Sequence, residues 1–168
     1  MEENYTVQGQ LRNMTGIYLT RKDKMLLLYR QGSKVVNNMW IASAGGHFEE
    51  NELNNARACV LRELQEELSI TEDMLENLCM RYVVLRNVKG EIRQNYYFFA
   101  DLKEDSKDDF SSGEGILKWF SIDELSSLEM PFSAKFAIEH YINEGRYTDC
   151  LYGGVADGDK VVFTEMRE

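Results

Sequence analysis

The strongest constraint on the fold is a change in hydrophobic period that follows the glycine pair Gly45-Gly46. Apolar side chains then recur at every fourth position, namely at Ala56, Val60, Leu64 and Leu68. Side chains four apart share one face of an α-helix, so this spacing predicts an amphipathic helix over about residues 55–68, with Asn54 or Asn55 as its N-cap. The opposite face is crowded with charge, so only the apolar stripe is expected to be buried.

Short β-rich runs account for most of the remaining pattern. Residues 16–20 and 25–29 flank a polar turn and predict an early hairpin. A further run at 39–44 is expected to end at the glycine pair, because glycine permits backbone geometries and close approaches that other residues resist. We expect further strands at 81–88, 92–102 and 117–122, helices at 72–78 and 133–143, a loop at 103–113, and a C-terminal hairpin that turns at 157–158.

Size and charge exclude several classes of protein. A chain of 168 residues with 43% hydrophobic composition suits one compact domain, so residues 1–168 are expected to form a single domain. The formal net charge of −10 disfavours nucleic acid polymers and anionic membranes as partners. Three cysteines scattered along the chain predict the reducing cytoplasm. A polar acidic start, with no apolar run of about 18 residues in the chain, predicts a soluble protein.

The charged face of the expected helix carries three glutamates at a spacing that suits metal binding. Residues three and four apart share a face, so Glu63, Glu66 and Glu67 are expected to project within a wedge of about 100°. Like charges one turn apart cost roughly 0.2 to 0.5 kcal/mol on a bare helix, which a cation would offset. Hard divalent cations such as magnesium prefer carboxylate oxygens and bridge them to substrate phosphates. Taken alone, the same pattern is also typical of a solvated helix face.

The segment GGHFEENELNNARACVLRELQEELSI, residues 45–70, extends this pattern on both sides of the glutamates. It resembles the Nudix box, which is a glycine, five residues, a glutamate, seven residues, and then Arg-Glu-aliphatic-any-Glu-Glu-any-Gly-aliphatic. A match at so many positions is far more specific than a short glycine motif, and it favours metal binding over a solvated face. The residues that fill the places of the box are Gly46, Glu52, Arg62, Glu63, Leu64, Glu66, Glu67 and Ile70.

Two positions depart from the box. Nine residues separate Glu52 from Arg62 where the pattern has seven, and the extra residues are expected in the turn before the helix, leaving the register of residues 62–67 intact. Ser69 stands where the family has a glycine that commonly ends the helix in a left-handed conformation. Ser69 is therefore expected to cost some stability at the helix end without removing a metal ligand.

The resemblance implies an α+β fold, the Nudix α/β/α sandwich with a mixed β-sheet between helices. It covers a core of about residues 15–145 and leaves a C-terminal extension at 146–168. The extension is expected to form a hairpin that joins either this core or a partner subunit. Because many relatives form dimers, a homodimer is an open alternative to a monomer.

The resemblance also implies roles for residues of the box. Glu63, Glu66 and Glu67 would bind magnesium, for which manganese could substitute, and the backbone carbonyl of Gly46 would be a further ligand. Arg62 would orient these groups. Either Glu66 or Glu67 would hold or deprotonate the attacking water, which needs no covalent enzyme intermediate.

Positions outside the helix are weaker candidates. Glu114, in the run GEGILKWF, resembles a later glutamate that binds metal or assists the water in the MutT-like branch, or it is one acidic residue in an acidic loop. Arg30, at the end of MLLLYR, resembles a residue that contacts substrate phosphates, or it is a solvent-facing strand end. The glycine pair Gly45-Gly46 can bring backbone groups close to a phosphate.

Other reactive or aromatic residues favour structural roles. His47 has no Ser or Cys partner for a catalytic triad and is assigned to a loop. Trp40, Trp119 and the aromatic residues at 96–99 are expected to lie in the core more than against a nucleobase. Cys59 lies beside the apolar stripe and is expected to be a small packed side chain.

The box specifies diphosphate chemistry and does not name the group attached to the diphosphate. The MutT-like branch implies a small nucleotide substrate, namely a nucleoside triphosphate, including oxidised purines such as 8-oxo-dGTP, cleaved to monophosphate and pyrophosphate. ADP-ribose or a nucleotide sugar is an alternative, because Glu129 stands near the place of the purine-reading asparagine. A non-catalytic nucleotide sensor is disfavoured by the intact glutamates, and an isopentenyl diphosphate isomerase by the lack of a well-placed cysteine.

Overall fold

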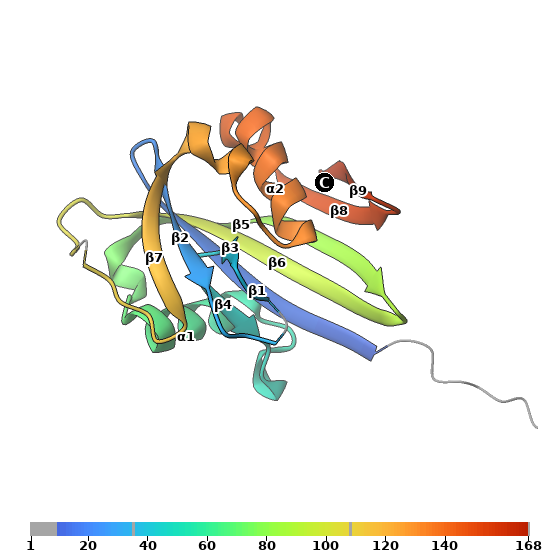
Figure 1. Ribbon diagram of the computed structural model, residues 1–168, viewed down its shortest axis with the longest axis horizontal. Helices are drawn as coiled ribbons and strands as arrows, with labels where there is room; N and C mark the ends of the chain where they lie inside the picture. Colours follow the sequence, from blue (N-terminus) through green and yellow to red (C-terminus); the bar gives the residue numbers. More distant parts are fainter. Residues whose placement is uncertain (1–9, 35, 108, 168) are drawn as a thin grey trace, which may run out of the picture.

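The computed structural model of the protein describes residues 10–34, 36–107 and 109–167 (Figure 1). Within these residues the strands are β1 (Gln10–Arg21), β2 (Lys24–Arg30), β3 (Met39–Ile41), β4 (Ala44–His47), β5 (Leu75–Val88), β6 (Glu91–Leu102), β7 (Gly115–Ser121), β8 (Leu151–Asp157) and β9 (Lys160–Met166). The α-helices are α1 (Ala56–Leu68) and α2 (Phe132–Asn143), and the 3-10 helices are η1 (Glu50–Glu52), η2 (Glu72–Met74), η3 (Ile122–Ser127) and η4 (Gly145–Tyr147). None of the described helices is long and apolar enough to span a membrane.

All of these strands belong to one mixed sheet. Its order is β3-β2-β1-β6-β5-β8-β9, with β4 paired to β1 and β7 paired to β2. β1 runs parallel to β6, and β5 runs parallel to β8, whereas the other pairs are antiparallel. β1, β6 and β5 therefore form the centre of the sheet.

The two α-helices cover opposite faces of the sheet (Figure 1). Because side chains alternate along a strand, β1 directs Ile17 and Leu19 into the apolar cluster around α1, and Tyr18 into the cluster around α2. All three residues are at most 1% exposed, so β1 is buried on both faces. The α+β sandwich expected from the sequence is confirmed.

α1 forms where the four-residue period predicts it. Val60 and Leu64 are fully buried against the sheet. The side chain of Asn55 accepts a hydrogen bond from the Ala58 amide at 3.0 Å, so Asn55, and not its neighbour, is the N-cap. At the other end Ser69 adopts the left-handed conformation with φ of 55°, which is the geometry that favours a glycine there.

The helix expected at residues 72–78 is wrong. A single 3-10 turn, η2, ends at Met74, and β5 begins at the next residue. Leu75 pairs with Leu102 on β6 and is 7% exposed, so sheet pairing and burial override the local helical preference. The second long helix is confirmed as α2.

The glycine pair does not end a strand, as was expected, but lies within β4 beside β1, and His47 also belongs to β4 and not to a loop. A Cβ on Gly45 would lie 2.2 Å from the backbone oxygen of Thr15, and a Cβ on Gly46 would lie 2.4 Å from the carboxyl carbon of Glu63. The close approach of β4 to the backbone of β1 therefore requires glycine at position 45, whereas at position 46 a side chain would displace the flexible end of Glu63 on α1.

The expected C-terminal hairpin forms and adds to the chain's own sheet. β8 lies parallel to β5, and β9 pairs with β8 across a turn in which Gly158 has φ of 65°. Tyr152 of β8 and Val161 of β9 are buried in the cluster around α2. The extension after residue 145 thus shares the main core.

Candidate active site

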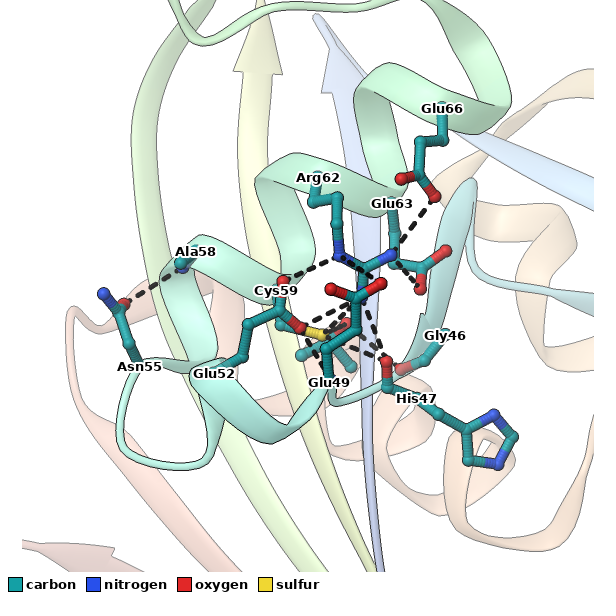
Figure 2. A network of polar contacts seen from close by, with 11 residues as sticks. Gly46, His47, Glu49, Glu52, Asn55, Ala58, Cys59, Arg62, Glu63 and Glu66 are labelled. Carbon is teal, nitrogen blue, oxygen red and sulfur yellow. Dashed lines mark hydrogen bonds and ion pairs between the residues drawn. The ribbon is translucent and has the colours of Figure 1, made fainter.

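A network of ion pairs is centred on Arg62 of α1 (Figure 2). The guanidinium donates to both carboxylate oxygens of Glu52, at 2.7 and 3.0 Å, and to Glu63 and Glu66 at 2.8 and 3.1 Å. It also donates to the backbone carbonyl of His47 at 3.1 Å. The hydrogen bonds from Arg62 hold the pKa of Glu52 at about 2. One arginine thus ties α1 to β4 and neutralises carboxylates that would otherwise repel one another.

The two extra residues of the box are absorbed before the helix, as expected. η1 and the turn after it bring Glu52 back against Arg62, and Glu52 is 5% exposed. The backbone amide of Glu49 donates to the Glu52 carboxylate at 2.9 Å, which closes a capping box over this turn. The insertion therefore leaves both Glu52 and the register of residues 62–67 in place.

Glu67 lies at the inner end of the glutamate set. Its Oε2 accepts a hydrogen bond from the Gly45 amide at 3.3 Å. Burial, together with the negative charges of Glu114 and Glu63, raises the pKa of Glu67 to about 7. A cation beside Glu67 would offset both the burial of this carboxylate and the negative charges of Glu114 and Glu63.

The structure brings the two weaker candidates, Arg30 and Glu114, to the same place. Arg30 ends β2 and is paired in register with Gly115 at the start of β7, so the residue before Gly115 stands beside it. Arg30 Nη1 lies 3.4 Å from Glu114 Oε2. The cavity at this point is lined, among others, by Arg30, Gly46, Arg62, Glu63, Glu67 and Glu114.

The lining of this cavity fits a hard divalent cation in its donor chemistry. Carboxylates of Glu63, Glu67 and Glu114 contribute to the wall, and magnesium prefers oxygen ligands of this kind. The Glu63 carboxylate lies directly over Gly46, where a Cβ would displace it, so the strand's backbone is within reach of the same space. The residues present are therefore those that a magnesium site would use.

The three helix glutamates converge only in part. Glu63 and Glu67 line the cavity, whereas the side chain of Glu66 is 59% exposed and is not part of the lining. In the part of the chain that the structure describes, no three acidic, His or Cys side chains are arranged as a complete metal site. The physical reason is Arg62, which holds both Glu63 and Glu66 by hydrogen bonds and would have to release oxygens to a cation.

A second cavity, of about 190 Å³, lies between the sheet and the start of α2 and shares Arg30, Gly45, Glu67 and Glu114 with the first. No motif in the sequence indicated five of its other polar residues, because they come from three different strands and meet only through strand register. These five residues are Arg12, Tyr18, Arg86, Arg93 and Asn95.

His47, which the sequence did not assign to the site, lines the first cavity. Its Nε2 accepts a hydrogen bond from Arg12 Nε at 2.6 Å, and burial and the Arg12 charge lower the pKa of His47. The other residues considered from the sequence have structural surroundings. Cys59 is fully buried, as expected for a small packed side chain. Trp40 and Trp119 are partly buried and pack against the clusters around α2 and α1, respectively, which confirms their expected place at the core.

The sequence matches the family model of the NUDIX domain over residues 10–141, so the chain belongs to the Nudix family. The structure is similar to that of a MutT protein from Bacillus halodurans, with a TM-score of 0.66 and 22% identity over 92% of this chain and 97% of that one. It is also similar to a MutT protein from Methanosarcina mazei Go1, with a TM-score of 0.65 and 18% identity over 84% and 99% of the two chains. The chain shares the fold of these two proteins and is a Nudix hydrolase, an enzyme of the pyrophosphohydrolase class.

Other comparisons leave the substrate open. An Ap4A hydrolase from C. elegans has the same fold, with a TM-score of 0.60 and 18% identity over 77% of this chain and 94% of that one. No protein of curated function matches the sequence. Nudix enzymes act on small nucleotide substrates and generally use a divalent metal, and these two properties are what the family assigns to the site.

Proposed function

We propose that the protein hydrolyses a nucleoside triphosphate, including oxidised purine forms such as 8-oxo-dGTP, to the monophosphate and pyrophosphate with magnesium, for which manganese can substitute. The observation that carries the proposal is that Glu63, Glu67 and Glu114 line one cavity beside the glycine backbone of β4. Carboxylates grouped in this way suit a hard divalent cation that is bridged to substrate phosphates.

In this proposal the ligands are Glu63, Glu66 and Glu67, with the backbone carbonyl of Gly46. Bound magnesium supplies charge neutralisation and an activated water. Glu66 accepts a hydrogen bond from Arg62 at 3.1 Å, so it would have to leave that arginine to act as a ligand. Arg62 keeps its bidentate pair with Glu52 and so holds the helix in position while Glu63 and Glu66 turn.

The other residues of the site bind the substrate and handle the water. Glu66 or Glu67 holds the water or takes its proton, and Glu114 assists from the opposite wall. Arg30 lies between the two cavities and directs its guanidinium to substrate phosphates. The backbone of Gly45 and Gly46 allows the phosphate chain to approach β4 closely.

The test is the release of pyrophosphate or phosphate from a panel of substrates, with and without magnesium. The panel contains the dNTPs, 8-oxo-dGTP, ADP-ribose and nucleotide sugars, and each is assayed with the wild type, with Glu67→Gln and with Glu76→Gln. Glu76 is exposed on β5 and is the matched control. We expect magnesium-dependent turnover of a triphosphate that Glu67→Gln loses and Glu76→Gln retains.

Three results would contradict this proposal in different ways. Normal turnover by Glu67→Gln would remove the assigned role of the helix glutamates. Turnover of ADP-ribose in place of triphosphates would redirect the substrate to nucleotide sugars. Binding of nucleotides without any turnover would favour a sensor module.

The proposal also covers the state of the protein in the cell. Residues 10–167 share one core, because the C-terminal hairpin is buried against α2, and we propose a single domain on that basis.

Val162 and Met166 on the edge strand β9 are 51% and 56% exposed, and a second copy in a homodimer would cover them. Light scattering tests the dimer, and cell fractionation tests the proposed cytoplasmic location.

A further inference from the structure

Three arginines form a row across neighbouring strands at the second cavity. In the sheet register, Arg12 of β1 lies beside Arg93 of β6, and Arg93 lies opposite Arg86 of β5. All three side chains line the same cavity. Like charges at directly paired positions destabilise a sheet, and this row stands in a chain with a net charge of −10. Such a row therefore points to a negatively charged group that is bound there.

The protein compensates only part of this positive charge. Glu91 Oε1 accepts a hydrogen bond from Arg93 Nε at 2.8 Å and lies 3.8 Å from Arg12 Nη1. Within the described residues Arg86 has no carboxylate partner, and its guanidinium carbon lies 4.0 Å from the centroid of the Phe132 ring. Stacking on a ring occupies the face of a guanidinium and leaves its N–H edge available to a planar or tetrahedral oxyanion.

Two further features of the cavity supply hydrogen-bond donors. Tyr18 is 1% exposed and lines the cavity, and its hydroxyl has no hydrogen-bond partner in the described structure. α2 begins at this cavity with no side-chain cap, and Ser133 and Ala134 of its first turn belong to the lining. The free amides and the positive end of the helix dipole thus lie near the arginine row.

We infer that the second cavity binds an anionic group of the substrate, a phosphate or a carboxylate, in addition to the diphosphate that is cleaved. Glu67 and Glu114 also line this cavity, in the part that it shares with the first, but among the described residues neither forms an ion pair with an arginine of the row. A neutral base could accept hydrogen bonds from this wall but would leave Arg86 without a counter-charge. The inference rests on the proposed function, because cleavage takes place at the adjoining cavity. It narrows the substrate to nucleotides that carry a further negative charge, with Arg86 and Arg93 as the residues that determine this specificity.

The first experiment compares substrates in matched pairs that differ by one anionic group. Coenzyme A and 3′-dephospho-coenzyme A differ by a phosphate, and UDP-glucuronate and UDP-glucose differ by a carboxylate. GTP and its 3′-phosphorylated derivative test an added phosphate on a nucleoside triphosphate. For at least one pair we expect wild-type kcat/KM to favour the anionic member by roughly 10-fold or more, the effect of one hydrogen bond to a charged group. Arg86→Met should abolish this preference, so that the two members of the pair are turned over with equal kcat/KM.

The chain offers a matched control for that substitution. Arg146 also stacks on an aromatic ring, 4.8 Å from the centroid of Tyr147, and does not line the cavity. Arg146→Met should therefore keep the wild-type preference. Equal kcat/KM for both members of every pair in the wild type, or a preference that survives Arg86→Met, would overturn the inference.

A second measurement does not depend on turnover. Inorganic phosphate is titrated into the metal-free protein, and the arginine Nε–H signals are followed by NMR. We expect shifts at Arg86 and Arg93, with affinity reduced about 10-fold in Arg86→Met and unchanged in Arg146→Met. Phosphate that shifts neither arginine refutes the anion site even if a triphosphate is cleaved. Shifts at both arginines without cleavage of any diphosphate refute the proposed function and leave the anion site standing.

Discussion

The two ends of the site balance their charges in opposite ways. At the α1 end, a single arginine, Arg62, faces Glu52, Glu63 and Glu66, so the acidic groups carry their own counter-ion. At the α2 end, Arg12 and Arg93 share Glu91, and Arg86 has no acidic partner among the described residues. At the α1 end the protein itself neutralises the carboxylates, whereas at the α2 end some positive charge remains for an anionic ligand.

This difference explains how an acidic protein can attract anionic substrates. A net charge of −10 repels a polyphosphate at long range, so attraction must come from local groups that the solvent screens poorly. The row of arginines and Arg30 supply this attraction on one side, and a cation held by the glutamates would supply it on the other. Substitutions at each end can therefore test whether the arginines and the glutamates have these roles.

The largest effect is expected from Arg62→Met. Glu52 is 5% exposed and would lose both of its guanidinium hydrogen bonds, so the free energy of unfolding should fall by about 2–4 kcal/mol. Urea denaturation measures this change. Turnover should fall as well, because Glu63 and Glu66 would no longer be oriented.

Two companion variants make this test specific. Arg57 lies on the same helix and forms an exposed ion pair with Glu72, so Arg57→Met should cost less than about 1 kcal/mol. Replacing the buried carboxylate as well, in the double variant Arg62→Met with Glu52→Met, should recover part of the lost stability. Equal stability of Arg62→Met and Arg57→Met would show that the network does not hold the acidic end.

The next effect separates the two adjacent glycines of β4. A Cβ at Gly46 would meet the flexible end of Glu63 at 2.4 Å, so Gly46→Ala should displace that carboxylate and reduce kcat about 10- to 100-fold, with little loss of stability. A Cβ at Gly45 would meet the backbone of Thr15 at 2.2 Å, so Gly45→Ala should mainly destabilise the fold. Steady-state kinetics and thermal melts of both variants measure the split, and identical behaviour of the two would contradict it.

A smaller effect is expected from pH in the metal-free protein. The pKa of Glu67 is about 7 in the folded protein against an ordinary value of about 4.5, so the folded state binds this proton more tightly than the unfolded state. The stabilising contribution is therefore complete below pH 4.5 and is lost as the pH rises toward 7. Allowing for solvent screening, the loss should be on the order of 1–2 kcal/mol relative to Glu67→Gln.

The causes of the raised pKa of Glu67 suggest both the measurement and its control. Urea denaturation at a series of pH values should show the wild type declining relative to Glu67→Gln over this range. Because the charge of Glu114 contributes to the raised pKa of Glu67, Glu114→Gln should make the decline shallower. Parallel stability profiles of the wild type and Glu67→Gln would refute the described environment of this carboxylate.

The acidic end could be predicted from the sequence because its residues are local. The register of Arg62, Glu63, Glu66 and Glu67 follows from the helical period, and the burial of Val60 follows from the same rule. The split between inner Glu67 and outer Glu66 could not be predicted, because it depends on β4 approaching one side of α1.

The basic end could not be predicted, because it depends on pairing between distant strands. Arg12, Arg86 and Arg93 carry no local pattern, and only the parallel pairing of β1 with β6 brings the first beside the third. The environment of Glu67 likewise depends on Glu114, which reaches the site through the pairing of β2 with β7. The wrong helix at residues 72–78 has the same origin, since pairing of Leu75 with Leu102 decided its structure.

The smallest effect is expected at the end of α1, where the chain departs from the family pattern. Ser69 has φ of 55°, a conformation that strains a side chain and not a glycine. Ser69→Gly should raise the free energy of unfolding by about 0.5–1 kcal/mol, whereas Ser69→Ala should not. Turnover should be unchanged, because Ser69 contacts neither cavity. A change in kcat without a change in stability would instead mean that this position acts on the glutamates, and that the helix end belongs to the catalytic apparatus.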